Sequence, residues 1–172
     1  MTSNEFNPDS LYALIIGINE YLDEYPSLRG AKPDAIKFNL FLSEKLAVPE
    51  CHRSIMLNST RDEIIFAFTQ LKEGRLRINE HESIEIPKGS AFVLYYAGHG
   101  GRTAIPKEWT DYRTADGQVE QLVPSDIGQC RGSDSIQGIP DRTVAAVLKG
   151  LMERIGDNVV SVIPAFQLRK NK

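Results

Sequence analysis

The sequence is poor in cysteine, with only Cys51 and Cys130 among its 172 residues. Two cysteines cannot form the several disulfide bridges that stabilise small secreted domains. Neither lies in a Cys-x-x-Cys pair or among several histidines, which excludes the usual pattern of a structural zinc site. We therefore expect no metal centre and a reducing, cytoplasmic setting.

Long apolar runs and an excess of positive charge are also missing. No run reaches the roughly 20 residues that a membrane-spanning helix needs. The first ten residues lack the charged and apolar regions of a signal peptide. The formal net charge is -3, and basic residues concentrate only in residues 169–172. A nucleic-acid partner and a membrane location are therefore not expected.

The chain instead contains an alternation of short apolar runs and helical patterns. The apolar runs at 12–18, 54–57, 92–96 and 159–163 predict strands of a mostly parallel sheet, and those at 12–18 and 92–96 have the composition of buried strands. Helical spacing of apolar residues falls between these runs. The order favours a single α/β domain, with a mostly parallel sheet and helices on both faces. Residues 1–10 are expected to be disordered.

Each helical pattern has a recognisable start and end. Proline at a first helical position, a Thr-Glu capping box and an aspartate cap are typical starts, and glycine often ends a helix. The predicted helices run from Pro33 to near Val48, from Thr60 to near Gly74 and from Asp141 to Gly156. The polar segments 75–90 and 102–140 are predicted to be irregular, apart from an extended stretch at 119–123.

The stretch at 91–101 reads AFVLYYAGHGG and is predicted to contain a central strand of the sheet. His99 directly follows its apolar strand, and in open α/β sheets the chemistry lies beyond the carboxyl ends of the strands. The flanking glycines leave room for another backbone to approach. His99 is therefore a candidate catalytic base, and the alternative is a loop histidine that only follows a strand.

Six blocks, in this order and spacing, resemble the caspase-like domain of fungal metacaspase-type proteins: YALIIGINEY, LRGAKPDA, FVLYYAGHGG, QLVPSD, GIPDRT and GDNVV. The resemblance covers residues 11 to about 162. It implies a three-layer α/β fold with helices on both faces of the sheet, in which residues 11–163 form the large-subunit part. We expect the C-terminal strands of that fold to be missing, because residues 164–172 do not match the family.

The resemblance also implies roles for particular residues. Members of the family are Cys-His endopeptidases, in which a histidine takes the thiol proton and backbone N–H groups hold the oxyanion. By motif position, His99 is the base and Gly100 the oxyanion donor. Asp34 matches an aspartate that helps to form an acidic pocket for Arg or Lys. A carboxylate in a first helical turn also interacts favourably with the helix dipole. The alternative that Asp34 only stabilises the start of its helix therefore stays open.

The position of the nucleophile departs from the family. There the fourth strand runs into Asp-Cys-Cys-His-Ser-Gly, with the second cysteine as nucleophile, whereas Phe166 stands at that position here. A phenyl ring cannot ionise or attack a carbonyl. Cys51 lies at the amino end of a strand, away from the crevice, and Cys130 lies in a long loop without a fixed base. The chain is therefore expected to be inactive as written.

Calcium activation is a further trait of metacaspases. Glu120 and Asp141 fall near the expected acidic positions, but Arg142 stands where another acid would help. Fewer than the roughly six oxygen ligands that calcium takes remain, so no cofactor is expected.

Two function classes stay open. One is a cysteine endopeptidase that cuts peptide or protein substrates after a basic residue, of which this chain would be an incomplete piece. The other is a non-catalytic caspase-fold module or decoy that self-associates or pairs with another caspase-like chain. The second class follows from the strand at 159–163, which is expected to form a sheet edge with unpaired backbone groups.

Overall fold

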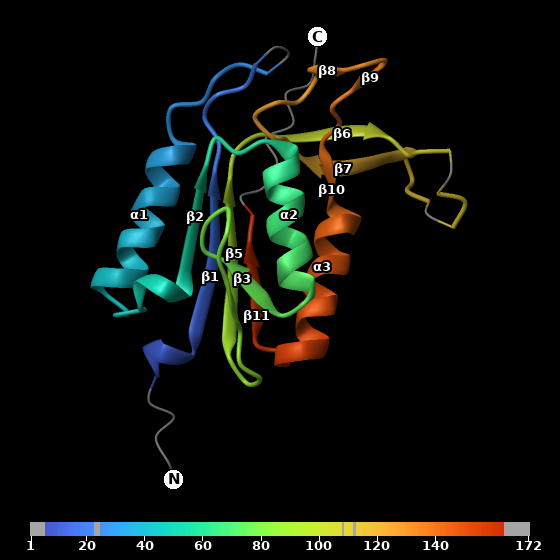
Figure 1. Cartoon of the computed structure of the whole chain (residues 1–172). Coiled ribbons are helices and arrows are strands. Elements are labelled where there is room, and N and C mark those ends of the chain that lie inside the picture. Colours follow the sequence, from blue (N-terminus) through green and yellow to red (C-terminus); the bar gives the residue numbers. More distant parts are fainter. Residues whose placement is uncertain (1–5, 23–24, 108, 112, 164–172) are drawn as a thin grey trace.

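The main sheet of the molecule contains four parallel strands in the order β11-β5-β1-β2. The computed structural model describes residues 6–22, 25–107, 109–111 and 113–163. The strands span Leu11–Gly17 (β1), Arg53–Leu57 (β2), Ala91–Ala97 (β5) and Val159–Val162 (β11). They correspond to the four apolar runs of the sequence. Figure 1 shows them side by side, with their carboxyl ends at the same edge.

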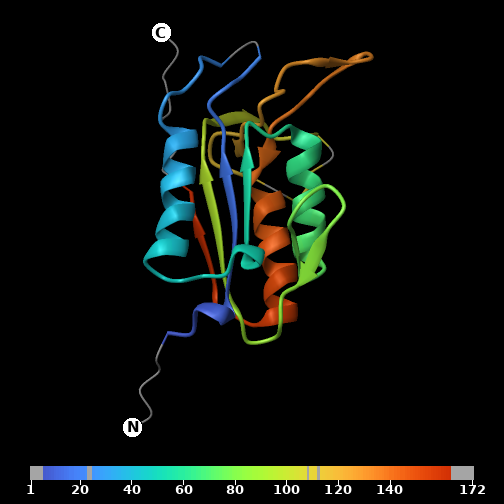
Figure 2. The same cartoon turned by 60° about the vertical axis from the view of Figure 1, so that its left-hand side comes forward.

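Helices cover both faces of this sheet, as the sequence predicts. α1 (Ala31–Glu44) lies on one face, and α2 (Arg61–Lys72) and α3 (Asp141–Ile155) lie together on the other (Figure 2). The larger cluster of buried apolar side chains lies between the sheet and the α2–α3 layer, and the smaller one lies under α1. The three-layer α/β arrangement is thus confirmed. None of the helices within the described residues is long and apolar enough to cross a membrane.

β1 is buried along its whole length. β5 and β2 pair with it on its two sides, and helices cover both of its faces. Its side chains alternate between the layers, so that Leu14 and Ile16 join the α2–α3 cluster while Ala13 and Ile15 join the α1 cluster. A continuous apolar run is what this position in the sheet requires.

β5 differs from the sequence expectation on one face. Phe92, Leu94 and Tyr96 belong to the α2–α3 cluster and are each 1% exposed. Val93 and Tyr95 point to the α1 side and are only partly buried. The reason is that α1 packs mainly against β1. The expected burial of this strand on both faces is therefore wrong on the α1 side.

α1 begins earlier and ends sooner than the sequence predicts. It starts at Ala31 rather than Pro33. The proline still falls in the first turn, where backbone N–H groups make no intrahelical hydrogen bond, so its lack of an N–H removes none. The helix ends at Glu44 rather than near Val48, because Ala47 adopts a left-handed conformation with a φ of 54° that continues no helix.

α2 starts as predicted, and α3 does not. The Thr60 hydroxyl accepts from the Glu63 N–H at 3.4 Å, and the Glu63 carboxylate accepts from the Thr60 N–H at 2.8 Å, which completes the capping box. For α3 the N-cap is Pro140, and Asp141 is the first helical residue. The predicted aspartate cap is therefore wrong by one position. Gly156 ends α3 with a φ of 110°, as expected.

Short strands lie in the two segments that the sequence predicts to be irregular. β3 and β4 form one hairpin, β8 and β9 form another, and β6, β7 and β10 form a separate antiparallel sheet. These strands span Arg75–Arg77 (β3), Ser83–Glu85 (β4), Gly100–Ala104 (β6), Gln118–Leu122 (β7), Cys130–Arg131 (β8), Asp134–Ser135 (β9) and Ile139–Pro140 (β10). β7 confirms the extended stretch predicted at 119–123. The other strands are short and mostly polar, so apolar periodicity does not reveal them.

The segment before β1 is partly ordered, in contrast to the disorder expected for residues 1–10. A 3-10 helix spans Pro8–Ser10, and the Asn7 side chain caps it by accepting from the Asp9 N–H at 3.1 Å. A second 3-10 helix, Glu50–His52, precedes β2. The first five residues lie outside the described part of the chain.

The close packing of α1 on β1 depends on Gly17. A Cβ at this position would lie 2.6 Å from the Ala35 Cβ and 3.1 Å from the Ala31 carbonyl oxygen. We expect Gly17→Ala to lower the free energy of unfolding by about 1–3 kcal/mol, because the helix has to move away from the strand. Urea denaturation measures the difference.

Gly30→Ala is the matched control. A Cβ there meets only the Asp34 Oδ2 atom, at an ordinary contact distance of 3.6 Å. Gly30 is the N-cap of α1, where alanine is less favourable than glycine, so we expect this variant to lower the free energy of unfolding by no more than about 1 kcal/mol. Equal losses in the two variants would contradict the packing explanation.

Candidate active site

The carboxyl ends of β1 and β5 meet at the sheet edge that carries His99. The Ile18 N–H donates to the Ala97 carbonyl at 2.9 Å, so the two strands end at the same level. His99 follows β5 after Gly98 and directly precedes β6. It therefore lies at the junction between the parallel sheet and the antiparallel sheet, at the edge where the sequence places it.

One ring nitrogen of His99 is held by the backbone. Nε2 lies 2.8 Å from the carbonyl oxygen of Pro26, in the loop after β1. A carbonyl oxygen can only accept, so Nε2 carries the hydrogen and Nδ1 keeps a lone pair. The ring in this tautomer can take a proton at Nδ1, and the Pro26 carbonyl then stabilises the charge that appears on the ring.

Two tyrosine rings pack against this imidazole. The ring centroids of Tyr21 and Tyr25 lie 4.8 Å and 5.4 Å from that of His99. Burial raises the pKa of the Tyr21 phenol to about 12, against the opposing effect of the hydrogen bond from the His99 N–H. The phenol therefore presents a neutral hydroxyl beside the imidazole at neutral pH.

Gly100, the expected oxyanion donor, is the first residue of β6 and pairs with Leu122 of β7. The Val123 N–H donates to the His99 carbonyl at 3.2 Å, which makes Gly100 and Leu122 a non-hydrogen-bonded pair. The Gly100 N–H therefore points away from β7. The predicted loop after His99 is wrong, because this segment is a paired strand that fixes the peptide between His99 and Gly100.

Asp34, the expected pocket residue, lies in the first turn of α1. α1 begins at the edge of the sheet where β1 and β5 end (Figure 1). The carboxylate is exposed and lies 3.9 Å from the Lys37 Nζ atom. After the larger effect of burial, its charge also raises the pKa of the Tyr95 phenol on β5. These interactions connect Asp34 with Lys37 and Tyr95 rather than with His99.

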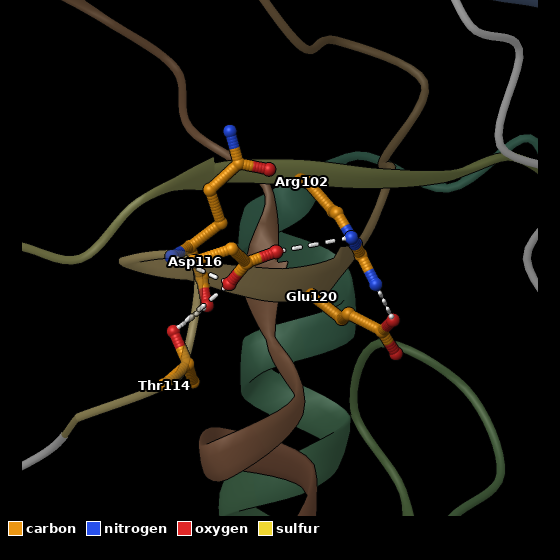
Figure 3. A network of polar contacts seen from close by, with 5 residues as sticks. Arg102, Thr114, Asp116 and Glu120 are labelled. Carbon is orange, nitrogen blue, oxygen red and sulfur yellow. Dashed lines mark hydrogen bonds and ion pairs between the residues drawn. The ribbon is translucent and has the colours of Figure 1, made fainter.

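The acidic residues considered for calcium are engaged in other interactions. Figure 3 shows the Arg102 guanidinium between Asp116 and Glu120, at nitrogen–oxygen distances of 3.1 Å and 3.0 Å. Asp141 instead accepts the N–H of its own helix neighbour at 2.6 Å. In the described part of the chain, no group of three His, Cys, Asp or Glu side chains is placed to hold a metal ion. This donor set does not fit calcium.

In the described part of the chain, both cysteines are free and exposed, and neither forms a hydrogen bond with His99. Cys51 lies in the 3-10 helix before β2, at the edge where the parallel strands begin. Cys130 is exposed on β8, and the other residue of that strand, Arg131, forms a surface ion pair with Asp62 of α2 at 2.6 Å. Phe166, at the position of the expected nucleophile, lies outside the described residues.

Two open hollows lie away from His99, around the connection between β6 and β7. They measure about 360 Å³ and 450 Å³ and share Trp109 and Thr110 in their lining. The Arg142 guanidinium of α3 packs over the Trp109 ring at 5.2 Å. His99 lines neither of these two hollows.

Sequence reasoning missed Tyr21, Tyr25 and Pro26, which surround the imidazole. All of them belong to the loop after β1, whose polar and proline content is typical of a surface connection. The signal that could have revealed them is the pair of tyrosines close to the end of a buried strand. Large aromatic rings in a loop need a surface to cover, and this edge provides one.

The chain is similar to known proteins over most of its length. A family model for the caspase domain matches residues 10–152. The solved structure of protein GSU0716 from Geobacter sulfurreducens is 19% identical, with a TM-score of 0.54, which concerns the fold alone. The match covers 88% of this chain and 47% of that one, so this chain spans about half the length of that structure. No curated protein matches.

The buried phenols predict a loss of stability at high pH. Burial raises the pKa of Tyr21 to about 12 and that of Tyr96 well above the ordinary value of 10.0. A folded pKa above the unfolded one means that this stabilisation is fully present below pH 10.0 and is lost as the pH rises toward 12. We expect the thermal unfolding midpoint to fall across that interval, and to fall less steeply for Tyr21→Phe. Equal slopes in both proteins contradict this assignment.

Proposed function

Because the chain belongs to the caspase-domain family, we propose that it carries the histidine half of a cysteine-endopeptidase site of the metacaspase type, with His99 as the general base. The supporting observation is the contact of 2.8 Å between Nε2 and the Pro26 carbonyl, which leaves Nδ1 to accept a proton.

In the proposed reaction, Nδ1 of His99 takes the proton of a cysteine thiol, and the thiolate attacks the scissile carbonyl. The carbonyl oxygen becomes negatively charged, and the Gly100 N–H, which points away from β7, stabilises it. The imidazolium then gives its proton to the leaving amine as the peptide bond breaks, which leaves a thioester. A water molecule that His99 deprotonates hydrolyses the thioester and restores the thiol.

For substrate specificity we propose a preference for Arg or Lys on the acyl side of the cut bond, with Asp34 as its acidic partner. The carboxylate is exposed at the same edge as His99, and its present counter-ion, Lys37, lies 3.9 Å away on the surface. Such a surface pair contributes about 0–1 kcal/mol, so a substrate cation can replace it. In an active form of the domain, we expect Asp34→Asn to raise KM for arginine substrates at least tenfold.

We propose that the chain as written is inactive, because Phe166 stands where the nucleophile belongs. Its proposed location is the cytoplasm. We expect no release of dye from arginine- or lysine-blocked peptides by the purified chain, with or without calcium. Peptide hydrolysis that disappears in the His99→Ala variant would contradict this.

A chimera tests the proposed function itself. Residues after Ile163 are replaced by the Asp-Cys-Cys-His-Ser-Gly continuation and the remaining half of a caspase-domain relative. We expect hydrolysis after basic residues, and its loss both on His99→Ala and on replacement of the second cysteine by serine. His81→Ala is the matched control, because His81 lies in the β3–β4 hairpin connection and is exposed. A folded chimera whose activity survives His99→Ala would overturn the proposed role of His99.

The edge of the sheet supports a second candidate function, a non-catalytic module that pairs with another chain. Within the described residues, β11 pairs on one side only, with β5. Val160 and Val162 are 53% and 40% exposed and stand opposite Val93 and Tyr95 on the α1 side. An apolar strand with unpaired N–H and C=O groups is a template for another strand. We propose a second copy, or another caspase-like chain, as the partner.

We expect the purified chain to sediment as a dimer or larger species at micromolar concentration. Val160→Lys places a charge on the apolar edge and is expected to give a monomer. Ile55→Lys is the matched control, because Ile55 lies on the opposite edge strand and is 38% exposed. A wild-type monomer with a cooperative melt, or equal dissociation by both variants, would exclude association through β11.

A further inference from the structure

Two tyrosine hydroxyls hold the peptide groups on either side of His99. The Tyr21 hydroxyl accepts from the His99 N–H at 2.8 Å. The Tyr96 hydroxyl donates to the His99 carbonyl at 2.7 Å. Each hydroxyl has a further partner, since Tyr21 donates to the Ile18 carbonyl at 3.0 Å. Tyr96 likewise accepts from the Val123 N–H at 3.2 Å. The backbone of His99 is therefore tied both to the end of β1 and to the end of β7.

The same two hydroxyls explain why residue 98 is a glycine. A Cβ on Gly98 would lie 2.6 Å from the Tyr96 Oη atom and 2.9 Å from the Tyr21 Oη atom. The φ of Gly98 lies outside the left-handed region, so the backbone conformation alone does not require glycine. The requirement is space, because the hydroxyls approach the backbone just before His99 from two sides.

We propose that Tyr21 and Tyr96 are positioning residues for His99, whose hydroxyls fix its backbone and thereby the direction in which its imidazole points. This rests on the proposed function, in which His99 is the base. Both tyrosines are buried, with 8% and 1% exposure, and the Tyr21 ring also packs on the imidazole at 4.8 Å. They act through His99, which keeps its Nε2 on the Pro26 carbonyl and its Nδ1 available for a thiol.

A purely structural role predicts a different result. Buried tyrosines commonly form hydrogen bonds with nearby backbone groups. In that case the loss of a hydroxyl lowers the free energy of unfolding but leaves the tautomer balance of the His99 imidazole unchanged. A positioning role requires that the imidazole of His99 changes its tautomer balance while the rest of the fold is retained.

The test uses the full chain and nuclear magnetic resonance, so it needs no peptide hydrolysis. In Tyr21→Phe, which keeps the ring, we expect the His99 amide to exchange its hydrogen roughly tenfold faster. We also expect the imidazole nitrogen shifts to move away from those of the Nε2–H tautomer. Tyr12→Phe is the matched control, because Tyr12 is another buried tyrosine, 5% exposed, near the opposite end of β1. This control is expected to leave both signals of His99 unchanged.

Unchanged imidazole shifts in folded Tyr21→Phe overturn the proposal, whether or not the exchange of the His99 amide changes. Gly98→Ala is an independent second variant, because its methyl group displaces both hydroxyls, and it is expected to give the same change of the imidazole signals. Imidazole signals like those of the wild type in Gly98→Ala also contradict the proposal. Failure of the cysteine-bearing chimera to cleave peptides refutes the proposed function and leaves these measurements unaffected, so the two failures are distinguishable.

Discussion

The parallel pairing of β1 with β5 is the constraint on which the candidate site depends. Its register places Leu11 opposite Ala91 and Gly17 opposite Ala97, and the Ile18 N–H adds one further bond to β5. Because both strands stop at the same level, the loop after β1 and the Gly-His-Gly turn after β5 share one edge. The Pro26 carbonyl can reach the imidazole for this reason, although 73 residues separate the two in the chain.

The loop that carries Pro26 is itself held at several points. The Asn58 side chain at the end of β2 accepts from the Asn19 N–H at 2.9 Å, and the Asn19 side chain accepts from the Lys32 N–H of α1 at 2.9 Å. The Leu28 N–H donates back to the Asn19 carbonyl at 2.8 Å, which closes the loop around Pro26. β2 and α1 therefore contribute to the site without touching His99, since they determine where the Pro26 carbonyl stands.

The features predicted from the sequence are those that short stretches determine. The apolar runs identify the strands, the Thr60 capping box identifies the start of α2, and the strand end identifies the position of His99. The β6–β7 pairing and the tyrosines around His99 depend on contacts between distant segments, such as Tyr21 with His99 across 78 positions. The half-open α1 face of β5 likewise depends on where α1 packs, which residue spacing alone does not determine.

The two edges of the main sheet are not equivalent, and the difference connects stability with function. β2 exposes Ile55, but its inner neighbour β1 is buried throughout. β11 exposes Val160, and its inner neighbour β5 is also partly open at Val93 and Tyr95. Burial of apolar surface is favourable by about 25 cal/mol per Å². The exposed apolar strip across β11 and β5 therefore favours association with a partner that covers it. In the proposed function, the family continuation after Ile163 would supply the cysteine and the missing strands together, whereas a second copy of this chain would cover the edge without supplying a nucleophile.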